Sequence, residues 1–247
     1  MATPLTDSIN ALTAYANEIT GGSDTNLSDA VHTLASGYGG GENYLKGAKC
    51  LYHLFDGATF PETLVLDFEG ASLTRTAEYF IANVTGVKYL TIKNLVWSNV
   101  SMQYSFNNSS METITFDNCV LQPVRVNRAF GSSYLKSVIG EIDLSLCTND
   151  NDMLYFSRAL ENIRFKKDTI GTNFTLTGTS KLSDETLVSI ANALNDSVSQ
   201  KVTGKNYAPR IETILGDNDN GTFVINQNGT LLLGDFITSV KGWTITT

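Results

Sequence analysis

Apolar residues recur at every second position in four short segments of the chain: LVLDF at 64–68, YLTIK at 89–93, TITFD at 113–117 and NIRFK at 162–166. A period of two places successive side chains on opposite faces of a β-strand. The pattern therefore predicts four half-buried strands. The expected inward residues are Leu64, Leu66, Leu90, Ile92, Ile114, Phe116, Ile163 and Phe165.

These strands recur with a fixed spacing. One column of phenylalanines comprises Phe55, Phe80, Phe106, Phe130 and Phe156, at intervals of 25, 26, 24 and 26 by subtraction. A second column comprises Leu64, Leu90, Ile114, Val138 and Ile163, at intervals of 26, 24, 24 and 25. Two columns in step indicate a solenoid, in which each repeat forms one coil and equivalent strands stack in a parallel sheet.

Two phrases in this region, SFNNSSMETITF at 105–116 and AFGSSYLKSV at 129–138, resemble the BspA-like branch of bacterial leucine-rich repeats. The resemblance covers residues 51–176. It implies an α/β leucine-rich repeat solenoid, right-handed with parallel strands, of about five to seven coils of 24–26 residues. The chain departs from the family in the first unit, LFDGATFPETLVL, and mostly lacks the proline that commonly follows the family's strand.

The fourth coil is irregular. In LKSVIGEIDLSL, at 135–146, either Val138 or Ile142 could occupy the strand column, and Gly140 suggests a bulge or a break between them. The pattern leaves both registers open.

Three segments are expected: 1–45, 46–180 and 181–247. The first is predicted to be a helical hairpin followed by the flexible linker Gly39–Gly41, the second is the solenoid and the third is a cap. In the cap, Ser183 and Asp184 begin the helix DETLVSIANALN, GTFVINQNGTLLL suggests a hairpin, and DFITSV suggests a short helix ended by Gly242 before the last strand, WTIT. The apolar stripe of the first of these helices comprises Leu187, Ile190, Ala191 and Leu194.

The two ends carry a further resemblance. The stretches KLSDETLVSIANAL and KGWTI resemble the ends of leucine-rich repeat proteins encoded among phage tail genes of Gram-positive gut bacteria. The initial stretch LTAYANEITGGSDTNLSDAVHTLASGY resembles a helical module at the start of phage tail or baseplate proteins. The resemblance implies that residues 1–45 attach the chain to a virion partner.

Charge and composition narrow the possible partners. The formal charge of −8 and the pI near 4.7 argue against binding to nucleic acid, because phosphate surfaces are held by clustered Lys and Arg. No apolar run is long enough for membrane insertion, and the chain as given shows no signal peptide. Three cysteines without CxxC spacing, Cys50, Cys119 and Cys147, are expected to be small buried hydrophobes.

No pattern of catalytic or metal-binding residues is visible, so neither an enzyme nor a metal or other cofactor is expected. The two histidines, His32 and His53, do not complete a metal site. The acidic run at 216–221 lacks the glycine and glutamate of a calcium loop, and both this run and the one at 148–153 are interpreted as turns.

The outward face of the stacked strands is the candidate binding surface. Its residues are Asp67, Thr91, Lys93, Thr115, Asp117, Arg164 and Lys166, with Asp67, Lys93, Asp117 and Lys166 expected in one line. Trp97 and Tyr104 are expected as aromatic anchors at its rim. The alternative is that opposite charges in neighbouring coils merely stabilise a solvated ladder.

The sequence thus favours a non-catalytic binding or structural protein that recognises a protein or glycan surface. The first hypothesis is a phage or prophage tail-associated component, located on the virion, that presents the solenoid to a host. The second is a BspA-like adhesin on the bacterial surface or outside the cell, which would need an export signal or anchor. An enzyme would need catalytic residues that meet only in space.

Overall fold

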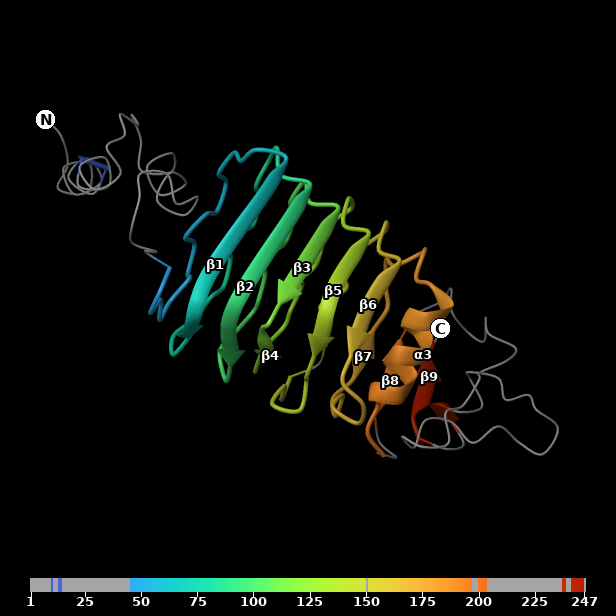
Figure 1. The fold of residues 1–247 in the computed structure, drawn as a ribbon. Coiled ribbons are helices and arrows are strands. Elements are labelled where there is room, and N and C mark those ends of the chain that lie inside the picture. Colours follow the sequence, from blue (N-terminus) through green and yellow to red (C-terminus); the bar gives the residue numbers. More distant parts are fainter. Residues whose placement is uncertain are drawn as a thin grey trace, which may run out of the picture.

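The computed structural model describes residues 10, 13–14, 45–149, 151–196, 200–203, 237–238 and 241–246. The chain forms a parallel β-solenoid of about six turns (Figure 1). The long sheet contains β1 (Thr63–Ser72), β2 (Tyr89–Ser98), β3 (Thr113–Asp117), β4 (Val120–Gln122), β5 (Ser137–Ile142) and β6 (Asn162–Phe165). A second sheet contains β7 (Phe174–Thr175), β8 (Lys201–Thr203) and β9 (Thr244–Thr246).

Register between the coils follows the predicted columns. Leu64 lies opposite Leu90, Leu90 opposite Ile114, and Ile114 opposite Val138, all in parallel pairs. The eight residues predicted to point inward are all buried. Alternation within each strand and repetition between strands therefore build one continuous apolar core, as the sequence predicts.

Turn segments on the other side of each coil are also hydrogen-bonded to their neighbours. Phe55 N donates to the carbonyl oxygen of Phe80 at 2.8 Å, and Phe106 N donates to that of Ala129 at 2.9 Å. The rings behind them form a stack, in which Phe106 lies 6.3 Å from Phe80 and 5.3 Å from Phe130, centroid to centroid. These aromatic contacts run along the solenoid axis and tie successive coils together.

The fifth phenylalanine of the predicted column is outside the core. Phe156 is 44% exposed, whereas Leu154, two residues earlier, is fully buried. The backbone explains the difference, because Phe130 N donates to the carbonyl oxygen of Met153 and so aligns Leu154 with the stacked rings. In the fifth coil Leu154 therefore takes the core position that Phe55, Phe80, Phe106 and Phe130 occupy in the others.

The irregular fourth coil uses both candidate residues. Val138 lies opposite Ile114, and Ile142 lies opposite Leu121 and Phe165, with a bulge between Ser137 and Glu141. Gly140 has a φ of 132°, and a Cβ there would lie 3.0 Å from Cβ of Phe116. Glycine thus allows β5 to bend without losing either core position.

A helix covers the last strand of the long sheet. The helix α3 (Asp184–Ala193) begins at Ser183, whose hydroxyl oxygen accepts from Thr186 N at 3.2 Å, and the four residues predicted for its apolar stripe are buried. The backbone N–H groups of Ile163 and Phe165 donate to the hydroxyls of Thr186 and Ser189 at 3.1 and 2.9 Å. Side chains of α3 thereby satisfy the edge of β6 and close the sheet.

The end of the chain packs on the cap. Trp243 is buried, and its Nε1 donates to the carbonyl oxygen of Asn195 at 2.7 Å. Buried Lys241 forms salt bridges with Asp168 and Asp196. The predicted last strand is confirmed as β9, and Gly242 has a φ of 72°, as the predicted glycine stop requires.

Other predictions fall outside the described residues. These are the helical hairpin at 1–45, the hairpin at 221–233, the acidic run at 216–221 and most of the short helix before Gly242. Between residues 45 and 183 the described chain consists of strands, bridges and turns, so the solenoid contains little helix.

Candidate functional site

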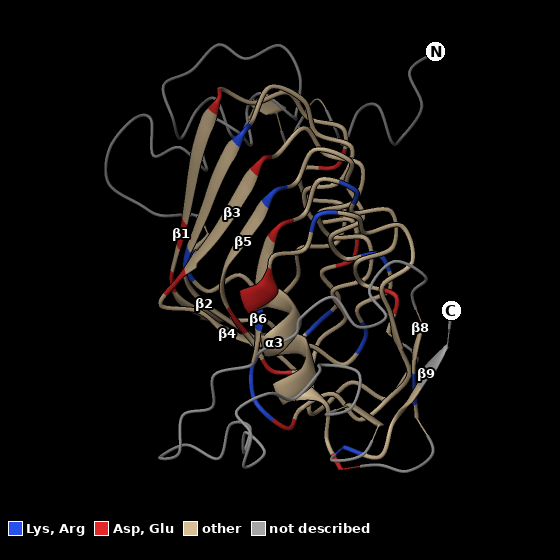
Figure 2. Cartoon of the chain, turned by 90° about the vertical axis from the view of Figure 1, so that its right-hand side faces the viewer, with Lys and Arg blue, Asp and Glu red and all other residues tan. Residues whose placement is uncertain are grey.

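Alternating charges mark the starts of the long strands. In Figure 2 the coloured block at each strand start alternates between red and blue from one coil to the next. Lys88 Nζ lies 3.0 Å from Glu62 Oε1, and Lys136 Nζ lies 2.6 Å from Glu112 Oε2. Both lysines donate hydrogen bonds to these carboxylates, which raises the pKa of each lysine, and the bond from Lys136 lowers the pKa of Glu112. We call Glu62, Lys88, Glu112, Lys136 and Glu161 the entry charge row.

A second charge row crosses the same face farther along the strands. Asp67 lies opposite Lys93, and Lys93 lies opposite Asp117, so three predicted site residues stand side by side as expected. Lys93 Nζ is 3.6 Å from Asp117 Oδ2. The Asp67 carboxylate accepts a hydrogen bond from the Asn94 amide and another from Glu69 N. These bonds, the first with the larger effect, hold the pKa of Asp67 below its usual value.

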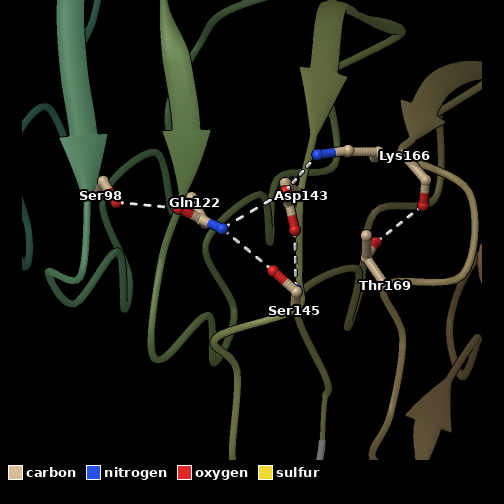
Figure 3. A network of polar contacts seen from close by, with 6 residues as sticks. All are labelled: Ser98, Gln122, Asp143, Ser145, Lys166 and Thr169. Atoms are coloured by element: carbon tan, nitrogen blue, oxygen red, sulfur yellow. Dashed lines mark hydrogen bonds and ion pairs between the residues drawn. The ribbon is translucent and has the colours of Figure 1, made fainter.

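Lys166 does not belong to this second row. It lies directly after β6 and belongs to a hydrogen-bonded network with Ser98, Gln122 and Asp143 (Figure 3). Lys166 Nζ lies 2.9 Å from Asp143 Oδ2. The bulge in β5 changes the register before this point, which is why the expected line of four charges contains only three.

Asp143 is the acceptor at the centre of that network. Burial alone would raise the pKa of Asp143, but hydrogen bonds from the hydroxyl and the backbone N–H of Ser145, and the bond from Lys166, outweigh burial and lower it. The ionised carboxylate therefore stabilises the folded chain.

Replacing Asp143 by asparagine is expected to lower the thermal midpoint at pH 7. A carboxyl whose pKa is lowered by folding contributes stability above its unfolded pKa of about 3.9, and loses it as the pH falls through the folded pKa. The difference between wild type and D143N should therefore shrink as the pH falls below about 4. Thermal unfolding of both proteins at pH 7, 5 and 3 measures this difference in midpoint. A difference that does not change with pH would contradict stabilisation by the ionised Asp143 carboxylate.

Between the entry charge row and the second charge row lies a strip without charges. It contains Thr63, Val65, Tyr89, Thr91, Thr113, Thr115, Ser137 and Ile139, and we call it the uncharged strip. Val65, Tyr89 and Ile139 are 46%, 46% and 53% exposed. Threonine methyls and hydroxyls lie among these larger side chains, so the strip offers apolar contact together with hydrogen-bonding groups.

The strip sharpens the predicted binding face. Thr91 and Thr115, both predicted, lie opposite each other near its centre. Sequence reasoning missed Tyr89 and Ile139, although extending the alternation one step before Leu90 and one step after Val138 would have placed both on the outward face.

Arg164 marks the far end of this face. It lies opposite Glu141 on β5 and is exposed beside a groove of about 500 Å³. Its guanidinium forms no salt bridge or hydrogen bond with the described residues, unlike the lysines of the long sheet. The structure thus places Arg164 apart from the paired charges with which it was predicted.

The two predicted aromatic anchors do not lie on the rim. Trp97 is fully buried between Phe80 and Phe106, whose ring centroids lie 6.2 and 6.1 Å from its own. It is buried because its side chain is one of those that point inward in the alternation of β2. Tyr104 lies in a turn segment and stacks on Tyr79 at 4.9 Å. The prediction for Trp97 is wrong, and Tyr104 packs within a ladder between coils.

The three cysteines differ in exposure, and His53 lies near the solenoid entrance. Cys147 is buried and Cys119 half-buried, but Cys50 is exposed, contrary to expectation. His53 Nδ1 lies 2.6 Å from Asp56 Oδ2. Across the described residues, His, Cys, Asp and Glu form no group of three suited to a metal ion.

Comparisons with known proteins add no further constraint. No family model, curated protein or solved structure matches the chain. Among the described helices, none has the length and apolar character needed to cross a membrane.

Proposed function

We propose that the chain is a non-catalytic recognition protein that binds a protein or glycan surface through the uncharged strip. The observation that carries the proposal is the strip itself, in which exposed Tyr89, Val65 and Ile139 lie among hydroxyl side chains. Solenoids need apolar residues inside, but nothing in the core requires exposed aromatic and aliphatic groups on the outer face of the sheet.

The paired charges on either side of the uncharged strip support a different role for those residues, in contacts between coils. Lys88, Lys93 and Lys136 each face a carboxylate of a neighbouring coil, so they serve the ladder between coils. Exposed pairs of this kind contribute little stability, but they leave few charges free for a partner. The uncharged residues between them are the better contacts, with Thr91 and Thr115 at the centre.

We further propose that the protein is a BspA-like leucine-rich repeat component associated with a phage or prophage tail. The family resemblance of residues 51–176 supports the repeat class, and the resemblance of both ends to tail-encoded proteins supports the location. In this proposal residues 1–45 attach the chain to a virion partner. The uncharged strip then faces the host surface.

Deleting residues 1–45 tests the tail proposal. The shortened chain should keep the thermal midpoint of the whole chain within a few degrees but should no longer be incorporated into particles. Immunoblotting of purified particles measures incorporation, and circular dichroism measures folding. Incorporation at the wild-type level would contradict the attachment role, whereas unfolding would assign residues 1–45 to capping of the solenoid.

A further inference from the structure

The bulge in β5 opens a groove at the end of the uncharged strip. Ser137 pairs with Asn162 and Glu141 pairs with Arg164, so β5 advances four residues where β6 advances two (141 − 137 and 164 − 162). The two additional residues of β5 leave a gap between the strands. Glycine at position 140 permits this path because its φ of 132° is strained for other residues.

The groove is lined by both strands and by the first turn of α3. Its volume is about 500 Å³, and its lining includes Ile139, Ile163, Asn162 and Thr186. Ser137 and Ile139 belong to the uncharged strip as well, so the groove continues the proposed binding face. Among the lining residues Ile163 is buried and Ile139 is half exposed, so the groove offers apolar as well as polar groups.

Three charged side chains line this groove without a partner. Arg164, Glu141 and Glu185 form no salt bridge or side-chain hydrogen bond with the described residues, whereas Lys88, Lys93, Lys136 and Lys166 each pair with a carboxylate. These three charges contrast with the ion pairs Lys88–Glu62, Lys136–Glu112 and Lys93–Asp117 in the two rows beside the groove. Donors and acceptors are therefore available there for a ligand.

We infer that this groove binds a neutral sugar ring at the end of a glycan chain. Neighbouring sugar hydroxyls donate and accept hydrogen bonds at once, which matches a guanidinium donor placed among two carboxylate acceptors. The C–H face of the ring packs on Ile139, which is half exposed. The inference rests on the proposed function and gives it a ligand class.

Charged ligands fit this groove less well. An acidic sugar would gain Arg164 but would meet Glu141 and Glu185, and the lining carries one positive against two negative side chains. Like-charge contacts with Glu141 and Glu185 oppose the binding of an acidic sugar, so among sugars the lining favours a neutral one.

Glycan binding by the full chain tests the inference. The probes are an array of neutral, sialylated and uronic-acid-containing oligosaccharides, followed by calorimetric titration with glucose, galactose, mannose and the strongest neutral oligosaccharide. The wild type should bind neutral glycans, and Arg164→Met should weaken that binding about 10- to 100-fold, because hydrogen bonds to a charged group are lost. Arg125→Met is the matched control, since it removes an exposed arginine outside the groove, and its affinity should stay within about twofold of wild type.

Several outcomes would overturn the inference. Neutral-glycan binding unaffected by Arg164→Met, or binding confined to acidic glycans, would place the sugar elsewhere or give it another charge. In another outcome, the array shows no binding to neutral glycans while the chain still binds whole cells and loses that binding when Thr91 and Thr115 become arginine. This result would contradict the sugar proposal but leave the proposed function intact. Absence of both cell and glycan binding would remove both.

Discussion

Replacing Phe106 with alanine is expected to lower the free energy of unfolding by about 3–5 kcal/mol. Phe106 is fully buried and its ring contacts those of Phe80, Trp97, Phe116 and Phe130, so truncation leaves a cavity shared by three coils. Close packing allows only partial relaxation around such a cavity. Urea unfolding followed by fluorescence or circular dichroism measures the loss.

The matched control for this prediction is Phe156→Ala. Both phenylalanines occupy the same repeat column in the sequence, but Phe156 lies outside the core, where it contacts Tyr155 and Arg158. Its truncation should cost less than about 1 kcal/mol. Equal losses of unfolding free energy for the two variants would contradict the position of Phe156 outside the core of the fifth coil.

Replacing Gly86 with alanine is expected to lower the free energy of unfolding by at least about 3 kcal/mol. Gly86 has a φ of 86°, and a Cβ there would lie 2.1 Å from the backbone oxygen of Phe60 in the preceding coil. The added methyl forces the first two coils apart at a point where Phe60 N donates to the carbonyl oxygen of Thr85. Thermal and urea unfolding of the full chain measure the effect.

The variant Gly70→Ala separates the cost of a steric clash from the cost of the left-handed backbone conformation. Gly70 has nearly the same φ, 85°, but nothing lies within 4 Å of a Cβ built there. This control should lose about 1–2 kcal/mol, the cost of a left-handed conformation for an L-residue. If the two variants lost the same amount, the close approach of the coils at Gly86 would be wrong.

The stacked strands could be predicted because two independent signals agree. Alternation selects the inward residues of each strand, and the repeat interval aligns Leu64, Leu90, Ile114 and Val138 between strands. Both signals arise from the same physical demand, burial of one face of every coil. The core of the long sheet therefore follows from the sequence alone.

Positions next to irregular backbone could not be assigned in this way. Leu154 and Phe156 are both apolar and two residues apart, and the hydrogen bond from Phe130 N to the Met153 carbonyl oxygen determines which one is buried. The bulge at Gly140 similarly moves Lys166 out of the expected line of charges. Such choices depend on contacts between coils, which composition and spacing do not encode.

The candidate site was predicted in part for the same reason. Outward positions follow from alternation, so Thr91 and Thr115 were identified, together with the paired charges Lys93 and Asp117. The groove was missed because it requires the differing lengths of β5 and β6 and the placement of α3 beside them. A sequence pattern marks the bulge at Gly140 but not the space that it opens.

Binding of the full chain to host cells and to protein and glycan arrays, measured with the Thr91→Arg, Thr115→Arg double variant, tests the recognition surface most directly. Both changes place a long charged side chain at the centre of the uncharged strip without altering a buried residue. The double variant Val120→Arg, Ser133→Arg carries the same added charge on exposed positions outside the strip. We predict at least a tenfold loss of binding, about 1.4 kcal/mol, for the first variant and less than a twofold change for the second. Equal binding by wild type and both variants would contradict recognition through the uncharged strip.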